Sequence, residues 1–530
     1  MMKRVFAAVA AAALALPAAA QQRPSSAPPE RPTLVVFITV DQLRPDYFTR
    51  YEHQLTGGLA RLRRRGAFFA NGLQDHAVTE TAPGHASTLS GRFPASTGIV
   101  ANAYGVGDPQ SELVGGGGAG ASPFRFRGST LIDWLRTADE RSRALSVSRK
   151  DRGAILPLGR AKQPVFWYAY DGRFTTSRYY ADTLPAWVAR FNARQPALRR
   201  AGQRWTLLLP ESAYPEPDSV PVEAAGRDFI FPHVLPSDSA GAVRNLPEFP
   251  WMDELTAEFA VQGLRAMNLG RGPQTDLLAV SFSTTDAVGH RYGPDSREIH
   301  DQVLRLDRTL GAFIDSVYAQ VDSSRVVFAL TADHGVSSFP EVANPAEARS
   351  WHVYLDTLVA RMHAGVRAAG GDTAAVEFDD GLLFVRRERL PRGFDVQSML
   401  LDFATRVRRL PGVARVDLMS DLWAMDPATR ERDEMARRWV HMIPRDQPIP
   451  LVVTLQPGRV WGTRTYAQHG SPHGYDARVP IIFYGPHFRP GRYDRAIRVV
   501  DMGPTLARVV GVAPTEALDG RVVEEVLADH

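Results

Sequence analysis

Three apolar, β-branched runs constrain the architecture of this chain more than any other feature. They span residues 34–40, 277–283 and 325–331, and polar side chains hardly interrupt them. Such continuous runs are typical of strands that are buried on both faces, as in a parallel sheet covered by helices. The sequence therefore predicts an α/β fold with a central, mostly parallel sheet flanked by helices on both faces.

Further segments fit around this sheet. Residues 299–321 give the clearest helix, because their apolar side chains recur on one face. We also expect a helix at 252–267, a short helix at 185–192, and an irregular insertion at about 200–250. The remaining expected elements are strands at 68–73, 144–148, 165–170 and 479–484 and C-terminal helices near 500–511 and 516–527.

A change of texture divides the chain into domains. Residues 340–460 hold Arg-rich helical stretches and short strands, which indicates an inserted α+β subdomain. The main, catalytic domain would then comprise residues 33–339 and 461–530.

The N-terminus has the pattern of a secretory signal peptide. Residues 1–20 combine a short basic start, an apolar run and small residues that end at Ala20, and residues 21–32 are a flexible leader rich in Pro, Ser and Gln. The rest of the chain has no run of 18 apolar residues, so we expect no membrane span. Cleavage after Ala20 would give a periplasmic or secreted protein.

Composition limits the chemistry. The chain has no cysteine, so disulfides are excluded and any metal site must use histidine and carboxylate ligands. The formal charge of +4 falls to +2 without Lys3 and Arg4 of the signal peptide, and such a small charge is weak evidence for a nucleic-acid partner. Beyond the leader, Lys150 and Lys162 are the two lysines of a chain that otherwise uses arginine.

Carboxylates follow each of the three apolar runs. Asp41 follows the first run, Asp286 the second and Asp333 the third. Open α/β sheets place their sites at the carboxyl ends of strands, and buried charges gathered there need a compensating ion. Oxygen and imidazole ligands without sulfur suit zinc in a catalytic role. Each motif alone could be a loop cap, but together they indicate a metal site; the histidines that follow are His290, His334 and His469.

Two further segments suggest phosphate chemistry. Thr81-Ala82-Pro83-Gly84-His85 has the pattern of a helix start, where unpaired N–H groups favour an anion, although Thr81 could also be an ordinary N-cap. Residues 149–152 form a basic cluster after the strand at 144–148. This cluster could hold an anion or could be a solvated loop.

These motifs closely resemble the alkaline phosphatase superfamily, in particular the single-chain bacterial alkaline phosphatases related to the type I phosphodiesterases and nucleotide pyrophosphatases. The resemblance covers most of residues 33–510 and implies that Thr81 is the nucleophile. It also implies two zinc ions, one held by Asp41, Asp333, His334 and the Thr81 oxygen, and the other by Asp286, His290 and His469. His473 is the alternative last ligand, but His469 fits the spacing to the terminal strand better.

The resemblance also implies a function. The chain would be an exported, zinc-dependent alkaline phosphatase that hydrolyses phosphate monoesters through a phosphothreonine intermediate. Asn102, Lys150 and Arg152 would bind the phosphoryl oxygens, and the Lys-x-Arg pair favours a monoester because a monoester has an extra charged oxygen. We expect small phosphorylated substrates, no nucleic-acid specificity and a monomer.

Three alternatives remain open from the sequence. The nearest is a phosphodiesterase or nucleotide pyrophosphatase on the same fold. A sulfatase is disfavoured, because sulfatases use a nucleophile derived from Cys or Ser and this chain has Thr81. An inactive phosphate-binding or cell-envelope protein is the third alternative.

Overall fold

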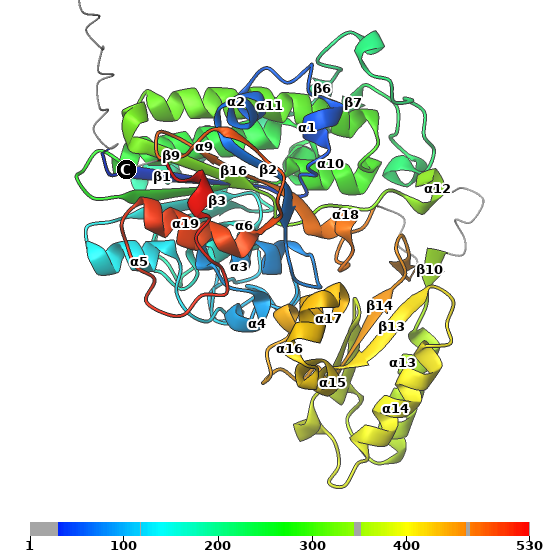
Figure 1. Cartoon of the computed structure of the whole chain (residues 1–530). Coiled ribbons are helices and arrows are strands. Elements are labelled where there is room, and N and C mark those ends of the chain that lie inside the picture. Colours follow the sequence, from blue (N-terminus) through cyan, green and yellow to red (C-terminus); the bar gives the residue numbers. More distant parts are fainter. Residues whose placement is uncertain (1–29, 117, 344–350, 463–466, 529–530) are drawn as a thin grey trace, which may run out of the picture.

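The computed structural model describes residues 30–116, 118–343, 351–462 and 467–528. The predicted signal peptide and nearly all of the leader lie outside the described residues. Figure 1 shows a large body built around one sheet and a smaller body below it. None of the described helices is both long and apolar enough to cross a membrane.

The three apolar runs form the centre of a ten-stranded sheet with the order β17-β2-β16-β9-β1-β8-β3-β4-β5, in which β18 also pairs with β2. β1 (Leu34–Val40) lies between β8 (Asp276–Phe282) and β9 (Val326–Thr331) and is parallel to both. All residues of these three strands are buried, which explains their continuous apolar character. The other strands are β2 (Ala67–Leu73), β3 (Ala144–Ser148), β4 (Val165–Tyr168), β5 (Phe174–Thr175), β16 (Arg478–Tyr484), β17 (Gly491–Tyr493) and β18 (Ile497–Arg498).

The pairing directions bear out the predicted fold class. β3 is parallel to β8 and to β4, whereas β16 runs antiparallel to both β9 and β2. The sheet is therefore mixed but mostly parallel, and the α/β prediction is confirmed.

Helices cover both faces of the sheet (Figure 1). One face carries α2 (Gly58–Arg65), α9 (Trp251–Met267), α10 (Thr284–Tyr292) and α11 (Arg297–Tyr318), and the other carries α3 (Thr81–Ser90), α5 (Leu131–Ala138), α6 (Asp151–Ile155) and α19 (Met502–Val509). Shorter helices are α1 (Tyr47–Arg50), α4 (Pro94–Thr97), α7 (Ala186–Ala193), α8 (Ser239–Asn245), α12 (Pro340–Ala343) and α18 (Gly474–Ala477).

The predicted irregular insertion at about 200–250 packs against α9, α10 and α11. It contains the short antiparallel pair β6 (Arg204–Trp205) and β7 (His233–Val234). The buried carboxylate of Asp301 on α11 holds it in place by accepting hydrogen bonds from Trp205 Nε1, from the backbone N–H of Leu208 and from the Tyr214 hydroxyl. One buried acid thus organises a segment that has little periodicity of its own.

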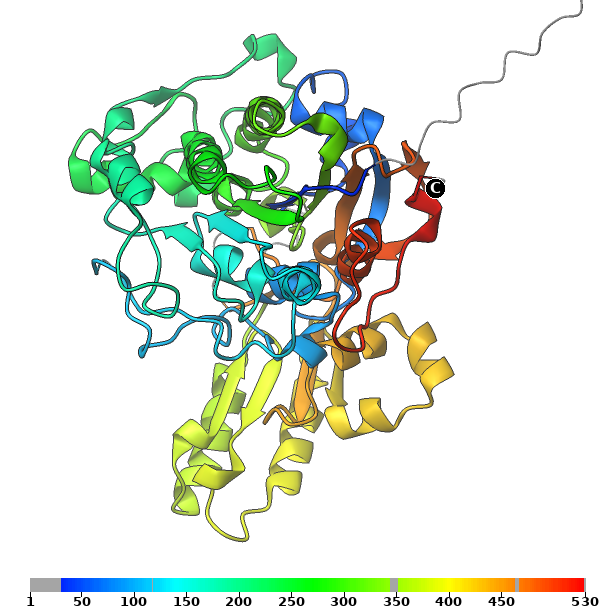
Figure 2. The same cartoon turned by 90° about the vertical axis from the view of Figure 1, so that its left-hand side faces the viewer.

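The smaller body has its own sheet and its own apolar core. Its strands follow the order β11-β12-β14-β13 and pair antiparallel. Both views show this body on one side of the large one (Figure 1, Figure 2). The elements are β10 (His352–Val353), α13 (Asp356–Ala368), β11 (Val376–Asp379), β12 (Leu382–Val385), α14 (Val396–Val407), β13 (Val413–Leu418), α15 (Met419–Ala424), α16 (Pro427–Arg432), α17 (Glu434–Met442), β14 (Leu451–Leu455) and β15 (Val460–Trp461).

A buried cluster joins the two bodies beside the start of α3. Ala77 and Val78, just before the Thr81 segment, pack with Phe384 of β12 and with Trp439 and Met442 of α17. The smaller body therefore supports the chain segment that leads into Thr81. The predicted domain borders at residues 340 and 460 stay a prediction, because segments outside the described residues lie close to both of them.

The predicted helix at 516–527 is wrong. This segment contains only a short 3-10 turn at Glu524–Val526. The backbone N–H groups of Asp519 and Gly520 both donate to the carbonyl of Gly91, and Asp519 accepts from the N–H of Phe93. Because these donors serve the end of α3, they are not available for a helical ladder.

Candidate active site

The carboxyl ends of β1, β8 and β9 bring three carboxylates together. Asp41 directly follows β1, Asp286 lies in the first turn of α10 after β8, and Asp333 follows β9. All three side chains are buried. The parallel pairing of adjacent strands forces these ends to the same edge of the sheet, as the sequence analysis expects.

Gln42 links two of these carboxylates. Its backbone N–H donates to Asp333 Oδ1 at 3.1 Å, and its side-chain Nε2 donates to Asp286 Oδ1 at 3.2 Å. Gln42 has a φ of 66°, and a side chain at Gly289 would lie 1.8 Å from Gln42 Oε1. The sequence analysis did not identify Gln42, because nothing in its local sequence indicates that this glutamine hydrogen-bonds to the residues that follow two other strands.

Three histidines complete the cluster with their Nε2 atoms turned inward. The Nδ1–H groups of His290, His334 and His469 donate to backbone carbonyls at 2.6, 2.9 and 2.9 Å; the acceptors are Ala467, Gly335 and Thr79, respectively. Since Nδ1 carries the hydrogen, each neutral ring presents an unprotonated Nε2 to the cluster. Fixing the outer nitrogen of a ring in this way is typical of metal-ligating histidines.

The ligand atoms form two groups. Asp41, Asp333 and His334 make one, and Asp286, His334 and His469 make the other, with the ligand atoms of each group within 4.8 Å of one another. The first group contains the three side chains expected for one ion. His334 belongs to both groups. In the second group it takes the place of His290, which the resemblance implies as a ligand there.

His290 nevertheless lies in the same cluster. Its Nε2 is 3.3 Å from Asp286 Oδ1 and 3.1 Å from His469 Nε2. His473 lies outside this cluster, because its Nε2 donates to the carbonyl of Leu455 in the smaller body at 2.8 Å. The structure thus brings together all six side chains that were expected as ligands and keeps the alternative apart.

The electrostatics of the cluster fit bound cations. Asp41 Oδ1 and Asp333 Oδ2 are buried without a hydrogen-bond donor. Burial, together with the nearby charges of Asp286 and Asp333, raises the pKa of Asp41 to about 6. Burial and the neighbouring imidazoles of His334 and His290 hold the pKa of His469 well below its ordinary value, which favours the neutral ring that ligates a metal.

Lys150 supplies a buried ammonium to this cluster. Its Nζ lies 2.6 Å from Asp41 Oδ2 and 2.7 Å from Asp286 Oδ2. Burial opposes the charged form of Asp286, but Lys150 and His290 outweigh it and hold the pKa of Asp286 well below its ordinary value. Lys150 and the Arg149 guanidinium, 3.5 Å from Asp286 Oδ2, do not balance three buried carboxylates. The residues present, with their two groups of ligand atoms, therefore fit two divalent cations.

Thr81 is the first residue of α3, and its hydroxyl faces the cluster. Thr81 Oγ1 lies 3.2 Å from Lys150 Nζ and 3.5 Å from His334 Nε2. A Cβ at Gly84 would lie 2.3 Å from the carbonyl oxygen of Asp333, so only glycine lets α3 approach the end of β9. His85 adds to this contact with Nδ1 3.1 Å from Asp333 Oδ2.

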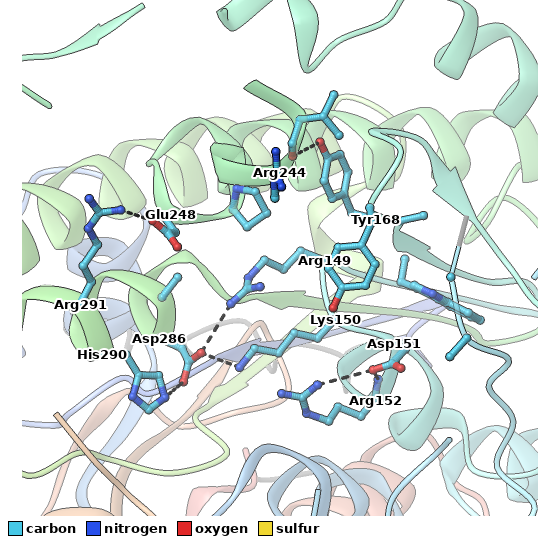
Figure 3. Close-up of a pocket in the computed structure, with 18 of the residues that line it drawn as sticks. Arg149, Lys150, Asp151, Arg152, Tyr168, Arg244, Glu248, Asp286, His290 and Arg291 are labelled. Atoms are coloured by element: carbon cyan, nitrogen blue, oxygen red, sulfur yellow. Dashed lines mark hydrogen bonds and ion pairs between the residues drawn. The ribbon is translucent and has the colours of Figure 1, made fainter. Parts of the chain in front are cut away.

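Two of the predicted substrate-binding residues, Asn102 and Lys150, contact the Thr81 segment, and Arg152 lies at the start of α6 close to Lys150. The side-chain oxygen of Asn102 accepts from the N–H of Ala82 at 2.9 Å, and its backbone N–H donates to Glu80 Oε2 at 2.6 Å. The Asn102 Nδ2 group has no hydrogen-bond partner among the described residues. Lys150 and Arg152 line a cavity of about 880 Å³ that also reaches Asp286 and His290 (Figure 3).

The comparison with known families agrees with this geometry. Residues 35–380 match the sequence profile of the family described as type I phosphodiesterase / nucleotide pyrophosphatase. The chain belongs to this family. The matched residues include the Thr81 segment and five of the six expected ligand side chains, all but His469.

Several relatives that are similar along nearly the whole chain are named alkaline phosphatases, and one, from Myroides odoratus, is named a calcium-transporting ATPase. Alkaline phosphatase PhoV of Synechococcus elongatus is 29% identical and covers 94% of this chain and 93% of its own. Alkaline phosphatase PhoK of Sphingomonas sp. is 29% identical, with 93% and 91% covered. The crystal structure of alkaline phosphatase PafA has a TM-score of 0.85 and 26% identity over 94% of this chain and 99% of that one. Membership of the alkaline phosphatase superfamily, expected from the motifs, is therefore confirmed.

Proposed function

We propose that this family member is an exported, zinc-dependent alkaline phosphatase that hydrolyses phosphate monoesters through a phosphothreonine at Thr81. One observation supports this most: the Thr81 hydroxyl, at the N-terminus of a buried helix, lies 3.5 Å from Nε2 of His334, which both ligand groups share, and 3.2 Å from a buried ammonium. Names of full-length relatives support the same class of activity. The signal-peptide pattern of residues 1–20 supports export.

The chain's own side chains define how a substrate would bind. The phosphoryl group would enter from the cavity that Lys150 and Arg152 line. Its non-bridging oxygens would meet these two side chains and Asn102 Nδ2. Donors fixed before the substrate arrives stabilise developing charge without reorganising. When bound, two divalent cations would supply Lewis-acid chemistry, which lowers the pKa of an alcohol nucleophile and offsets charge on a leaving oxygen.

Thr81 would then act as the nucleophile. Its oxygen forms a bond to phosphorus while the bond from phosphorus to the leaving oxygen breaks, and the leaving alcohol departs through the cavity. The oxygen of a water molecule then forms a bond to phosphorus while the bond from phosphorus to the Thr81 oxygen breaks, which releases inorganic phosphate and regenerates the free hydroxyl. Gly84 and His85 keep α3 against Asp333 through both steps, because they fix the start of the helix relative to the ligands.

The choice between monoesters and diesters rests on Lys150 and Arg152. A monoester presents one more charged oxygen than a diester, and an ammonium with a guanidinium can bind it. A phosphodiesterase is the second candidate, because the matching family profile carries that activity in its description.

The experiment compares an aryl monophosphate with the corresponding bis-aryl diester. In the variant that combines Lys150→Ala and Arg152→Ala, kcat/KM for the monoester should fall far more than kcat/KM for the diester. Lys162→Ala is the matched control, because Lys162 is exposed and contacts the ring of Tyr179 instead. Equal losses for both substrates, or a wild type that prefers the diester, would contradict the proposal.

A further inference from the structure

The cavity above the ligand cluster is much larger than a phosphoryl group requires. Its volume of about 880 Å³ is in the range of sites that enclose whole small molecules. The phosphoryl end is occupied by Lys150, Asp286 and His290, and the far wall is built by residues 167–170 and by α8. This outer part would therefore receive the leaving group of the substrate.

The charges that line this outer part are unequal. Arg291 is neutralised by Glu248 and also pairs with Asp228 at 3.0 Å. Arg244, in contrast, is exposed at the last turn of α8 and has no hydrogen-bond or ion-pair partner among the described residues. Its guanidinium is thus an uncompensated positive charge on the cavity wall.

Arg149 adds a second positive charge nearer the reaction centre. Its guanidinium donates to the carbonyl of Ser283 at 3.3 Å and lies 3.5 Å from Asp286 Oδ2. In the view of Figure 3, Arg149 lies between Arg244 and Lys150. Among the residues that the structure describes, the acids that line the cavity are Asp151, Glu248 and Asp286, and each of them already has a basic partner.

The fold fixes Arg244 on this wall. The Tyr168 hydroxyl at the end of β4 donates to the carbonyl of Val243 at 3.0 Å, which ties α8 to the central sheet. Gly172 packs against Val243 as well, because a Cβ there would lie 2.8 Å from its side chain. Arg244 therefore projects from an anchored helix end rather than from a free loop.

We infer that the outer part of the cavity is a second anion subsite, which binds a carboxylate or a second phosphate on the leaving group through Arg244, assisted by Arg149. The inference rests on the proposed phosphatase activity and narrows its substrate class to phosphate monoesters that carry another anionic group. A guanidinium suits both oxyanions, because it donates two parallel hydrogen bonds.

The test uses two substrates of matched shape, 3-carboxyphenyl phosphate and 3-carbamoylphenyl phosphate. The ratio of their kcat/KM values should fall about three- to fivefold in Arg244→Ala relative to wild type, as expected for a partly exposed charge pair. Comparing ratios between enzymes removes the intrinsic difference between the two leaving groups. Arg244→Lys should retain part of the preference, and Arg149→Gln should reduce it as well.

A third substrate, the 1,3-bisphosphate of the same ring, shows whether the subsite prefers a carboxylate or a phosphate. The preferred group is the one whose substrate loses more kcat/KM in Arg244→Ala. Arg265→Ala is the control, since Arg265 is exposed on α9 and does not line the cavity. A ratio that is unchanged in Arg244→Ala, while wild type hydrolyses both aryl phosphates, would overturn the subsite. Absence of hydrolysis of either aryl phosphate by wild type would instead overturn the phosphatase proposal itself.

Discussion

His290 Nε2 and His469 Nε2 lie 3.1 Å apart, although the opposite nitrogen of each ring donates its hydrogen to a backbone carbonyl. In their neutral forms the two rings therefore point lone pairs at each other. A positive charge between the nitrogens makes this contact favourable, and either a bound cation or a proton on His290 supplies it, since burial opposes the charged form of His290 but Asp286 outweighs it and raises the pKa of His290. Together with Asp41 Oδ1, which is buried without a hydrogen-bond donor, and with the two groups of ligand atoms, this contact supports bound metal.

His469 and His473, the two candidates for the last metal ligand, can be compared directly by mutation. We predict that His469→Ala loses one metal equivalent per chain and lowers kcat/KM for an aryl monophosphate at least about a hundredfold. His473→Ala should keep both, because the His473 ring bonds to Leu455 away from the cluster. Metal analysis of the purified variants and steady-state kinetics measure both effects. Loss of metal in His473→Ala alone would reverse the assignment.

Gly84 should be indispensable for activity. An alanine Cβ there would lie 2.3 Å from the carbonyl oxygen of Asp333, so Gly84→Ala must push α3 and Thr81 away from the ligands. A displacement of about 1 Å costs on the order of a hundredfold in rate, and we predict a loss of that size in kcat. In Gly365→Ala on α13 the added methyl group meets nothing within 4 Å, so activity should be unchanged. Wild-type kinetics in Gly84→Ala would contradict the role assigned to α3.

Asp301 should contribute strongly to stability. The carboxylate accepts three hydrogen bonds from the 200–250 segment and pairs with Arg305, all from a buried position. Asp301→Asn places an amide N–H₂ against these donors, so we predict a loss of about 2–4 kcal/mol in the free energy of unfolding. Asp315→Asn, on the exposed face of the same helix, should change it by less than about 0.5 kcal/mol. Chemical denaturation of both variants measures the difference; equal effects would contradict the anchoring role.

Glu223 should make stability depend on pH. Burial, followed by the charges of Glu298 and Asp218, raises the pKa of Glu223 from 4.5 to about 9. A raised folded-state pKa means that the contribution of Glu223 is full below about pH 4.5 and is lost as the pH rises toward 9. The melting temperature of Glu223→Gln minus that of wild type should therefore be larger at pH 9 than at pH 6.

The exposed Glu388 provides the control for this measurement. Glu388→Gln should differ from wild type by the same amount at both pH values. A difference between Glu223→Gln and wild type that stays constant with pH would show that Glu223 ionises normally in the folded protein.

The sequence predicts the centre of this fold well, because β1, β8 and β9 are buried on both faces and leave a continuous apolar signature. The position of Asp41, Asp286 and Asp333 then follows from parallel pairing alone. The segment at 516–527 misleads, because its donors bond to Gly91 rather than to one another. Local periodicity cannot reveal such long-range hydrogen bonds.

Other parts of the site depend on contacts between distant segments. Gln42 reaches Asp333 and Asp286, which lie more than two hundred residues away in the sequence. Arg244 lines the cavity because the hydrogen bond from the Tyr168 hydroxyl to the carbonyl of Val243 holds α8 against the sheet. Neither residue stands in a recognisable motif, so sequence reasoning had no signal for them.

Anomalous diffraction at the zinc edge from crystals of the purified protein tests the central claim most directly. We predict two peaks, one among Asp41, Asp333 and His334 and the other among Asp286, His290 and His469, with Thr81 Oγ1 beside the first. A single peak, no peak in this cluster, or a pair of peaks remote from Thr81 would contradict the account.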